Sequence, residues 1–286
     1  MAEEDAAGRV GASPEAISAH YDLSEDFFRL VLGPELVYSC ALFEPGDDLA
    51  AAQTRKLDHH IAAAAAVGAE RVLDVGCGWG ALLSRLVRNA GVQQAVGLTL
   101  SPSQAAWVRG LRLPSVEVRE EHWRDHVPAS RYDAVVSVGA FEHFVHRGLD
   151  PAQKLEAYRE FFAFCDRVLV SRGRLSLQTI AYSATPEAVD TFIFERIFRE
   201  SELPLVWEPI AAADRRFELV ALRNDREDYF RTLRLWDRNL GARWDEAVAL
   251  VGRPAAEEFR LYLRKSAAAF QSGLICLLRM TFAKIS

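Results

Sequence analysis

The stretch "RVLDVGCGWGALL" (residues 71–83) decides the fold that this sequence predicts. It begins with apolar residues that are typical of a buried strand, and Asp74 stands near the end of that strand. Gly76 and Gly78 follow before the pattern changes to that of a helix. Glycines at a strand-to-helix turn let a ligand lie against the backbone where the next helix begins. A tight turn without a ligand is the alternative, because this glycine spacing alone is a weak signal.

Strand and helix patterns alternate along the chain from this point. Further strands are expected at residues 94–100, 115–120, 132–138 and 173–180, with helices at 80–90, 101–111 and 151–169. This alternation predicts a doubly wound parallel α/β sheet.

The N-terminal part of the chain has helical patterns of its own. Ser13 and Pro14 predict a helix start, and the helical pattern runs to Gly33 with a break near residues 22–24. A second helix is expected at residues 48–68, ending at Gly68.

The C-terminal part begins with a predicted helical insertion at residues 183–215. Its aromatic face consists of Phe192, Phe194, Phe198 and Trp207. Strands are expected at 217–224 and 273–284, with two long helical patterns between them. The predicted parts, within one structural domain, are an N-terminal tail and helical cap (1–68), an α/β core (69–182), an insertion that covers the substrate (183–215) and the C-terminal part of the core (216–286).

Composition excludes several classes of protein. The net charge of −6 and pI of about 5.7, without a dense run of basic residues, argue against nucleic-acid binding. Four scattered cysteines without a CxxC pair predict neither a zinc site nor a disulfide framework, which suits the reducing cytoplasm. The acidic N-terminus does not look like a signal peptide, and no apolar run reaches the roughly 18–20 residues of a membrane span.

The segment "GLTLSPSQ" (97–104) follows the second strand of the core. A dinucleotide-binding enzyme would carry an acid here for the ribose, whereas this chain offers Thr99 and Ser101. Ser101 and Gln104 also form a helix capping box around Pro102, so capping and ligand contact are both open. Downstream, Trp123 is either a stacking surface for an adenine or a partly buried core residue.

The segment "VVSVGAFEHF" (135–144) places Glu142 and His143 just after another predicted strand. Because parallel sheets carry their chemistry at the carboxyl ends of strands, Glu142 is a candidate general base or metal ligand. A carboxylate that only caps a helix is the alternative. For His143 a structural role is favoured, because adjacent side chains diverge.

Seven segments occur in the order typical of one enzyme family. They are "YSCALF" (38–43), "LDVGCGWGALL" (73–83), "GLTLSPSQ" (97–104), "SVGAFEHF" (137–144), "TFIFERIFRESELP" (191–204), "LRNDREDYFRTLRLW" (222–236) and "YLRKSAAAFQSG" (262–273). From about residue 15 to 284 the chain resembles the cyclopropane fatty acid synthase and mycolic acid cyclopropane synthase family of S-adenosylmethionine-dependent methyltransferases. The resemblance implies a class I methyltransferase fold, Rossmann-like, with a seven-stranded sheet whose last strand is antiparallel.

The resemblance also implies a cofactor site for S-adenosylmethionine. Tyr38 and Ser39 would contact the methionine end, and Gly76 and Gly78 would pass beneath the cofactor. Thr99 and Gln104 would hold the ribose, while His122 and Trp123 would border the adenine. The full set of predicted cofactor-binding residues is Tyr38, Ser39, Asp74, Gly76, Gly78, Thr99, Ser101, Gln104, His122 and Trp123.

In the family, an alkene attacks the sulfonium methyl group, and the carbocation then loses a proton from that methyl group to close a cyclopropane. The base is a bound bicarbonate, and no metal is required. The matching positions here, predicted with His143 as catalytic residues, are Cys40, Glu142, Gln178, Ile180 and Tyr229. Gln178 departs from the family's His, and an amide cannot take up a proton near neutral pH. A weakened anion site would favour net C-methylation over ring closure.

Three functions from different classes follow. The leading hypothesis is methyl or methylene transfer to an alkene carbon of an apolar acyl, polyketide or terpenoid-like substrate, either free, lipid-bound or carrier-protein-bound. The second is N-methylation of a small amine, with Glu142 and His143 as base. The third is a catalytically silent cofactor-binding protein. A homo-oligomer is compatible with each.

Overall fold

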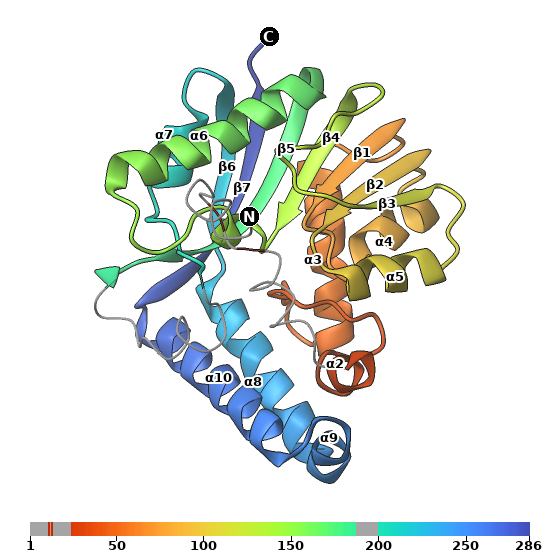
Figure 1. Ribbon diagram of the computed structural model, residues 1–286, viewed down its shortest axis with the longest axis vertical. Coiled ribbons are helices and arrows are strands. Elements are labelled where there is room, and N and C mark those ends of the chain that lie inside the picture. Colours follow the sequence, from red (N-terminus) through yellow and green to blue (C-terminus); the bar gives the residue numbers. More distant parts are fainter. Residues whose placement is uncertain (1–10, 12, 14–23, 187–199) are drawn as a thin grey trace, which may run out of the picture.

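The central element of the computed structural model is one seven-stranded sheet (Figure 1). The structure describes residues 11, 13, 24–186 and 200–286. Its strands are β1 (Arg71–Val75), β2 (Gln94–Thr99), β3 (Val116–Glu120), β4 (Tyr132–Val138), β5 (Leu169–Tyr182), β6 (Phe217–Asn224) and β7 (Ile275–Lys284). Their order across the sheet is β3-β2-β1-β4-β5-β7-β6. The pairs among β1–β5 are parallel, and β7 is antiparallel to β5 and β6, which confirms the predicted fold.

The strands form where the sequence is most continuously apolar. All five residues of β1 are buried, and Val135 and Val136 in β4 are buried as well. Parallel strands that are covered on both faces are typically apolar throughout rather than alternating. The chain order reverses between β1 and β4, and ligands of such sheets bind at the carboxyl ends of the strands at that point.

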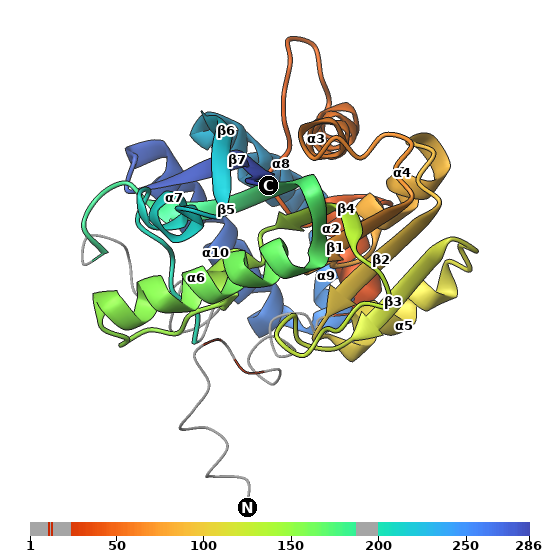
Figure 2. The ribbon, with the colours of Figure 1, turned by 90° about the horizontal axis from the view of Figure 1, so that it is seen from above.

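Helices cover both faces of the sheet, and Figure 2 shows α3 and α4 on one side and α6 on the other. The helices are α2 (Glu25–Leu32), α3 (Leu49–Ala63), α4 (Ala81–Asn89), α5 (Pro102–Gly110), α6 (Pro151–Val168), α7 (Glu208–Ala213), α8 (Arg226–Ala242), α9 (Trp244–Val251) and α10 (Arg253–Ser272). Leu57, Leu83 and Val108 belong to the apolar cluster on the first face, and Phe161 and Phe162 to that on the second. None of the described helices is long and apolar enough to cross a membrane.

A third apolar cluster lies beyond the carboxyl ends of the parallel strands. Because β6 runs parallel to β5, α8 begins at this end of the sheet, below the strands in Figure 1. There α8 and α10 pack with α2, and Phe27, Trp236 and Phe259 are buried among them. The N-terminal and C-terminal helices therefore close the edge where a ligand is expected.

Two elements differ from the sequence-based expectations. α3 ends at Ala63, not Gly68, because Ala65 has a left-handed φ of +52° that stops the helix. In the described parts of 183–215, α7 is the regular helix, and the exposed Trp207 does not pack into the core. Phe192, Phe194 and Phe198, like the helix expected at 14–23, lie outside the described residues.

Candidate active site

Two adjoining cavities lie at the carboxyl ends of the parallel strands. The first, of about 1100 Å³ with the space open to solvent included, is lined by the glycine turn after β1, the ends of β2 and β4 and the segment 121–123. The second, of about 840 Å³ on the same measure, lies between the end of β5 and helices α8 and α10. Tyr38, Ser39, Gly139 and His143 line both cavities, so a group bound in one can reach the other.

The glycine turn has two separate roles. Gly76 has a φ of +82°, and a side chain there would collide with the Cβ of Ala140 in the loop after β4. Gly78 has a φ of +53°, and a Cβ there would meet no atom within 4 Å. Since Gly78 lines the first cavity, its missing side chain leaves space for a ligand, while Gly76 permits close packing of two loops.

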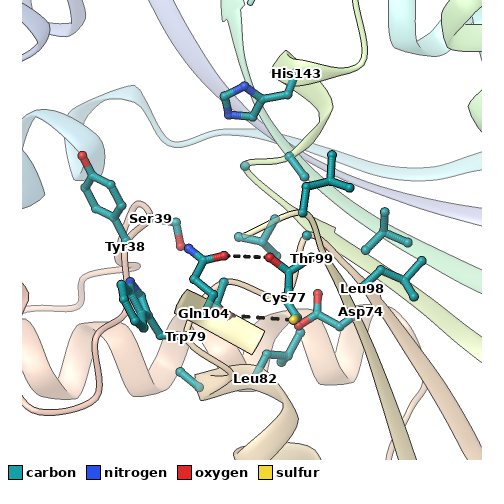
Figure 3. A pocket seen from close by; sticks show the side chains of 18 of the residues that line it. Tyr38, Ser39, Asp74, Cys77, Trp79, Leu82, Leu98, Thr99, Gln104 and His143 are labelled. Atoms are coloured by element: carbon teal, nitrogen blue, oxygen red, sulfur yellow. Dashed lines mark hydrogen bonds between the residues drawn. The ribbon is translucent and has the colours of Figure 1, made fainter. Parts of the chain in front are cut away.

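The end of β2 forms a polar wall of the first cavity, drawn in Figure 3. Thr99 Oγ1 donates to Gln104 Oε1 at 2.9 Å, which leaves the Gln104 amide N–H groups available to a ligand hydroxyl. Ser101 does not line either cavity. Its hydroxyl accepts from the Gln104 backbone N–H at 3.3 Å, so it caps α5, one of the two roles left open by the sequence.

Buried ionisable groups line the first cavity near Ser39. Asp74 is 2% exposed, and its Oδ1 has no hydrogen-bond partner in the described part of the chain. Burial raises the pKa of Asp74 to about 7. Lys56 Nζ donates to Ser39 Oγ at 2.8 Å, and burial lowers the pKa of Lys56 to about 7. An unpartnered buried carboxyl oxygen fits a ligand that brings N–H or O–H donors.

The segment after β3 borders the opposite side of this cavity. His122 and Trp123 both line it. Trp123 is 4% exposed, and its ring lies 5.4 Å from Phe144 and 5.5 Å from Phe164 between centroids. Trp123 is thus a core residue that also contributes to the cavity wall, and its role as a stacking surface for an adenine stays a prediction.

Glu142 lies in the second cavity, within the short 3₁₀ helix η2 (Phe141–His143) after β4. The backbone N–H of Ile180 donates to Glu142 Oε1 at 2.7 Å, while the buried Oε2 lacks a partner among the described residues. Burial raises the pKa of Glu142 to about 7. This bond to β5 does not fit the helix-capping alternative, and the described residues contain no cluster able to hold a metal ion.

Gln178 and Tyr229 join Glu142 in the second cavity. Gln178 Oε1 accepts from Arg279 Nε at 2.9 Å and lies 3.2 Å from His60 Nε2. The ring of Tyr229 packs against Phe270 at a centroid distance of 4.6 Å. Four positions predicted as catalytic, Glu142, Gln178, Ile180 and Tyr229, are therefore brought together.

The other two predicted catalytic positions lie differently. Cys40 does not line either cavity, because its Sγ points to the carbonyl oxygen of Ala41 at 3.1 Å. Burial raises the pKa of this thiol to about 12, so it stays protonated. His143 lines both cavities, its Nδ1 lies 2.7 Å from Ser201 Oγ, and burial lowers its pKa to about 4. It is therefore a neutral imidazole held at the junction.

Lys56, His60 and Arg279 contribute to the site although the sequence interpretation did not single them out. Lys56 and His60 are four residues apart on α3, so one helix face directs both toward the sheet. Arg279 is the one charged residue of the apolar strand β7 before the strand's last residue, Lys284. A charge in such a strand requires a buried partner, and that was the available signal.

Comparisons with known proteins agree with this geometry. Residues 11–280 match the family model described as mycolic acid cyclopropane synthetase. Cyclopropane mycolic acid synthase 1 of Mycobacterium tuberculosis H37Ra is 35% identical over 290 residues, which cover 94% of this chain and 96% of the relative. Cyclopropane mycolic acid synthase 3 of M. tuberculosis CDC 1551 is 33% identical over 277 residues, which cover 90% of this chain and 92% of that relative.

Solved structures show the same relationship. The crystal structure of mycolic acid cyclopropane synthase CmaA1 complexed with SAH and CTAB has a TM-score of 0.85 and 34% identity, covering 96% of this chain and 99% of its own. The crystal structure of coclaurine N-methyltransferase, at 20% identity and a TM-score of 0.78, shares the fold over 96% of this chain and 83% of that enzyme's chain. The chain therefore belongs to the mycolic acid cyclopropane synthetase family and is an S-adenosylmethionine-dependent methyltransferase.

Proposed function

We propose that the protein transfers the methyl group of S-adenosylmethionine to an alkene carbon of an apolar acyl, polyketide or terpenoid-like chain. The observation that carries this proposal is the composition of the second cavity. Its walls include Leu203, Leu233, Phe270, Ile275 and Leu277, and its polar groups gather around Glu142. An apolar chain fits such walls, and the polar cluster is available for proton transfer.

The first cavity fits the cofactor. The open space at Gly78 lets the cofactor lie directly against the backbone of the glycine turn, and the Gln104 amide suits the ribose hydroxyls. The unpartnered Asp74 Oδ1 suits the ammonium group of the methionine moiety, since a buried carboxyl oxygen needs a donor. When bound, the cofactor supplies a methyl group that is already electrophilic, so the protein's own task is to position the acceptor and exclude water.

The second cavity fits a bicarbonate ion as the proton acceptor. Glu142 Oε2 lacks a partner among the described residues, and the carboxyl pKa of about 7 allows the group to donate or accept near neutral pH. Tyr229 lines the same space. Ile180 holds Glu142 through its backbone N–H. We assign Glu142 and Tyr229 to holding the anion, and Ile180 to positioning Glu142.

The reaction balances without a redox partner. The alkene electron pair forms a bond to the methyl carbon as the carbon–sulfur bond breaks, which releases S-adenosylhomocysteine and leaves a carbocation on the chain. Tyr229, Tyr262 and Phe270 line the cavity, and aromatic rings favour such a cation electrostatically where they turn a face to it. The cation then gives up one proton to the base.

A cytoplasmic location fits the four buried free thiols Cys40, Cys77, Cys165 and Cys276. The relatives' names point to a lipid acyl acceptor, and we extend that acceptor class to this chain. A carrier-bound acceptor and a homo-oligomer stay proposals for separate tests.

The test uses S-adenosylmethionine with a carbon-13 methyl group and vesicles of unsaturated phospholipid, alongside a panel of small amines. We expect label in the organic extract, at a carbon shift of a saturated group bonded to carbon. Label on nitrogen, or transfer only to the amines, would overturn the proposal in favour of N-methylation.

A further inference from the structure

Arg279 is buried in the middle of β7, with 1% of its side chain exposed. Its Nη2 donates to the backbone carbonyls of Cys40 and Ala41, both at 3.0 Å. Its Nη1 pairs with Asp225, and its Nε donates to Gln178 Oε1 at 2.9 Å. One guanidinium group thus joins the segment before α3, the start of α8 and strand β5.

These contacts fix which way the Gln178 amide faces. Arginine carries donors only, so the Gln178 atom beside Arg279 Nε must be the carbonyl oxygen. His60 is compatible with this orientation. Burial holds the pKa of His60 well below its usual value, so the ring is neutral and carries one N–H. Because the Gln178 oxygen fixed by Arg279 can only accept, that N–H is assigned to Nε2, 3.2 Å from Gln178 Oε1, and Nδ1 then accepts from Ser176 Oγ at 2.8 Å.

The carbonyl oxygen of Gln178 has two lone pairs, and His60 and Arg279 occupy both. With both lone pairs of the oxygen occupied, the amide nitrogen is the polar atom of this side chain that remains for the second cavity, which Gln178 lines together with Glu142 and Tyr229. A cation at the carbonyl end also polarises the amide and strengthens its N–H groups as donors.

We propose that Arg279 is a positioning residue that locks Gln178 as a permanent hydrogen-bond donor to an anion in the second cavity. The proposal rests on the proposed function for the identity of that anion, bicarbonate. It differs from the expectation that Gln178 weakens the anion site, because that expectation took no account of the charge behind the amide. With the donor retained, the carbocation gives its proton to the bound anion and the product is a cyclopropane.

The first test removes the charge. Arg279→Met keeps an unbranched apolar chain in the strand, and Asp225 retains its second partner, Arg223, at 2.9 Å. The matched control is Arg71→Met, because Arg71 is also buried and its Nε donates to a glutamine, Gln94, at 2.8 Å, outside both cavities.

Bicarbonate binding is measured by carbon-13 NMR titration of labelled bicarbonate into protein saturated with S-adenosylhomocysteine. We expect Arg279→Met to weaken binding by roughly ten- to hundredfold, the loss typical of a hydrogen bond to an ion. The affinity for S-adenosylhomocysteine should be unchanged, and Arg71→Met should bind like the wild type. In turnover assays the KM for bicarbonate should rise while the KM for S-adenosylmethionine stays constant. A merely structural role would instead weaken the affinities for bicarbonate and S-adenosylhomocysteine together and raise both KM values.

A second variant covers the case in which Arg279→Met fails to fold. Gln178→Glu keeps an oxygen for Arg279 and His60 but replaces the amide donor by a second carboxylate oxygen. It should fold and should lose bicarbonate binding. Wild-type bicarbonate affinity in either folded variant, or an absence of bicarbonate binding in the wild type, overturns the proposal.

The titration needs no methyl acceptor, so its outcome does not depend on which acceptor the protein methylates. If the wild type binds bicarbonate through Gln178 but methylates no alkene, only the proposed function fails. If it methylates alkenes while Arg279→Met retains full bicarbonate affinity, only the role of Arg279 fails.

Discussion

The backbone N–H of Ile180 donates to Oε1 of Glu142 at 2.7 Å, across from β5 to the loop that follows β4. The other carboxyl oxygen faces a cavity with no partner among the described residues. One oxygen of Glu142 is therefore held by the fold, and the other is available to a ligand.

Glu142→Gln should reduce turnover by about 10²-fold or more while S-adenosylmethionine affinity changes little. The amide oxygen can keep the Ile180 hydrogen bond, but the side chain no longer exchanges a proton, and such groups typically contribute about 10²–10⁴ in rate. Steady-state kinetics and calorimetry check both parts. Glu208→Gln is the control for neutralising a buried carboxylate, because Glu208 accepts from the Leu205 backbone N–H at 2.7 Å and pairs with Lys154 at 3.1 Å but lines neither cavity. A fully active Glu142→Gln enzyme would show that this carboxyl group takes no part in proton transfer.

The same substitution should increase stability at alkaline pH. Burial raises the pKa of Glu142 from 4.5 to about 7 in the fold. The contribution of this group to stability is complete below pH 4.5, and it is lost as the pH rises through 7. The loss is on the order of 3 kcal/mol.

Gln does not ionise, so the unfolding free energy of Glu142→Gln minus that of the wild type should increase between pH 5 and pH 8. Urea denaturation at the two pH values measures that difference, in which unaltered groups cancel. A difference that does not vary with pH would mean that Glu142 ionises normally in the fold.

Gly78→Val should abolish measurable S-adenosylmethionine binding, because the added side chain occupies the first cavity. Gly68→Val is the control, since Gly68 has a φ of +70°, no atom within 4 Å of its Cβ direction and a position outside the cavities. Both variants should lose a similar stability, about 1–3 kcal/mol, from the left-handed backbone. Calorimetry should show binding in the control alone; equal affinities in the two variants would place the cofactor elsewhere.

Ser101→Ala should lower stability by about 0.5–2 kcal/mol through loss of the cap on α5. Cofactor affinity should not change, because Ser101 does not line the first cavity. Denaturant unfolding and calorimetry on the same preparation separate the two effects. A selective loss of affinity at full stability would reassign Ser101 to the ligand.

Much of the fold follows from local pattern. Apolar runs such as β1 and β4 predict strands because both faces are covered, and the capping residues of α5 and α6 are visible in the sequence. The end of α3 was predicted wrongly because its alanine run contains no helix breaker, and the turn at Ala65 depends on packing.

The site was predictable where a motif carries it and not where the tertiary structure does. Glu142 and Gly78 stand in recognisable segments. The contact of Arg279 with Gln178 joins residues 101 positions apart, and no local pattern encodes such a pairing. Cys40 was expected in the anion site, yet its backbone carbonyl accepts from Arg279 and it lines neither cavity.

The most direct measurement of the central claim uses S-adenosylmethionine whose methyl group carries three deuterium atoms, with unsaturated phospholipid as acceptor and bicarbonate present. Mass spectrometry and carbon NMR of the product count the deuterium atoms retained and locate the label. Transfer to an alkene carbon followed by ring closure leaves two of the three atoms in a cyclopropane methylene, and this is the predicted result. A methyl group on carbon that retains all three would contradict ring closure, and label on nitrogen or no transfer to the lipid would contradict the alkene acceptor itself.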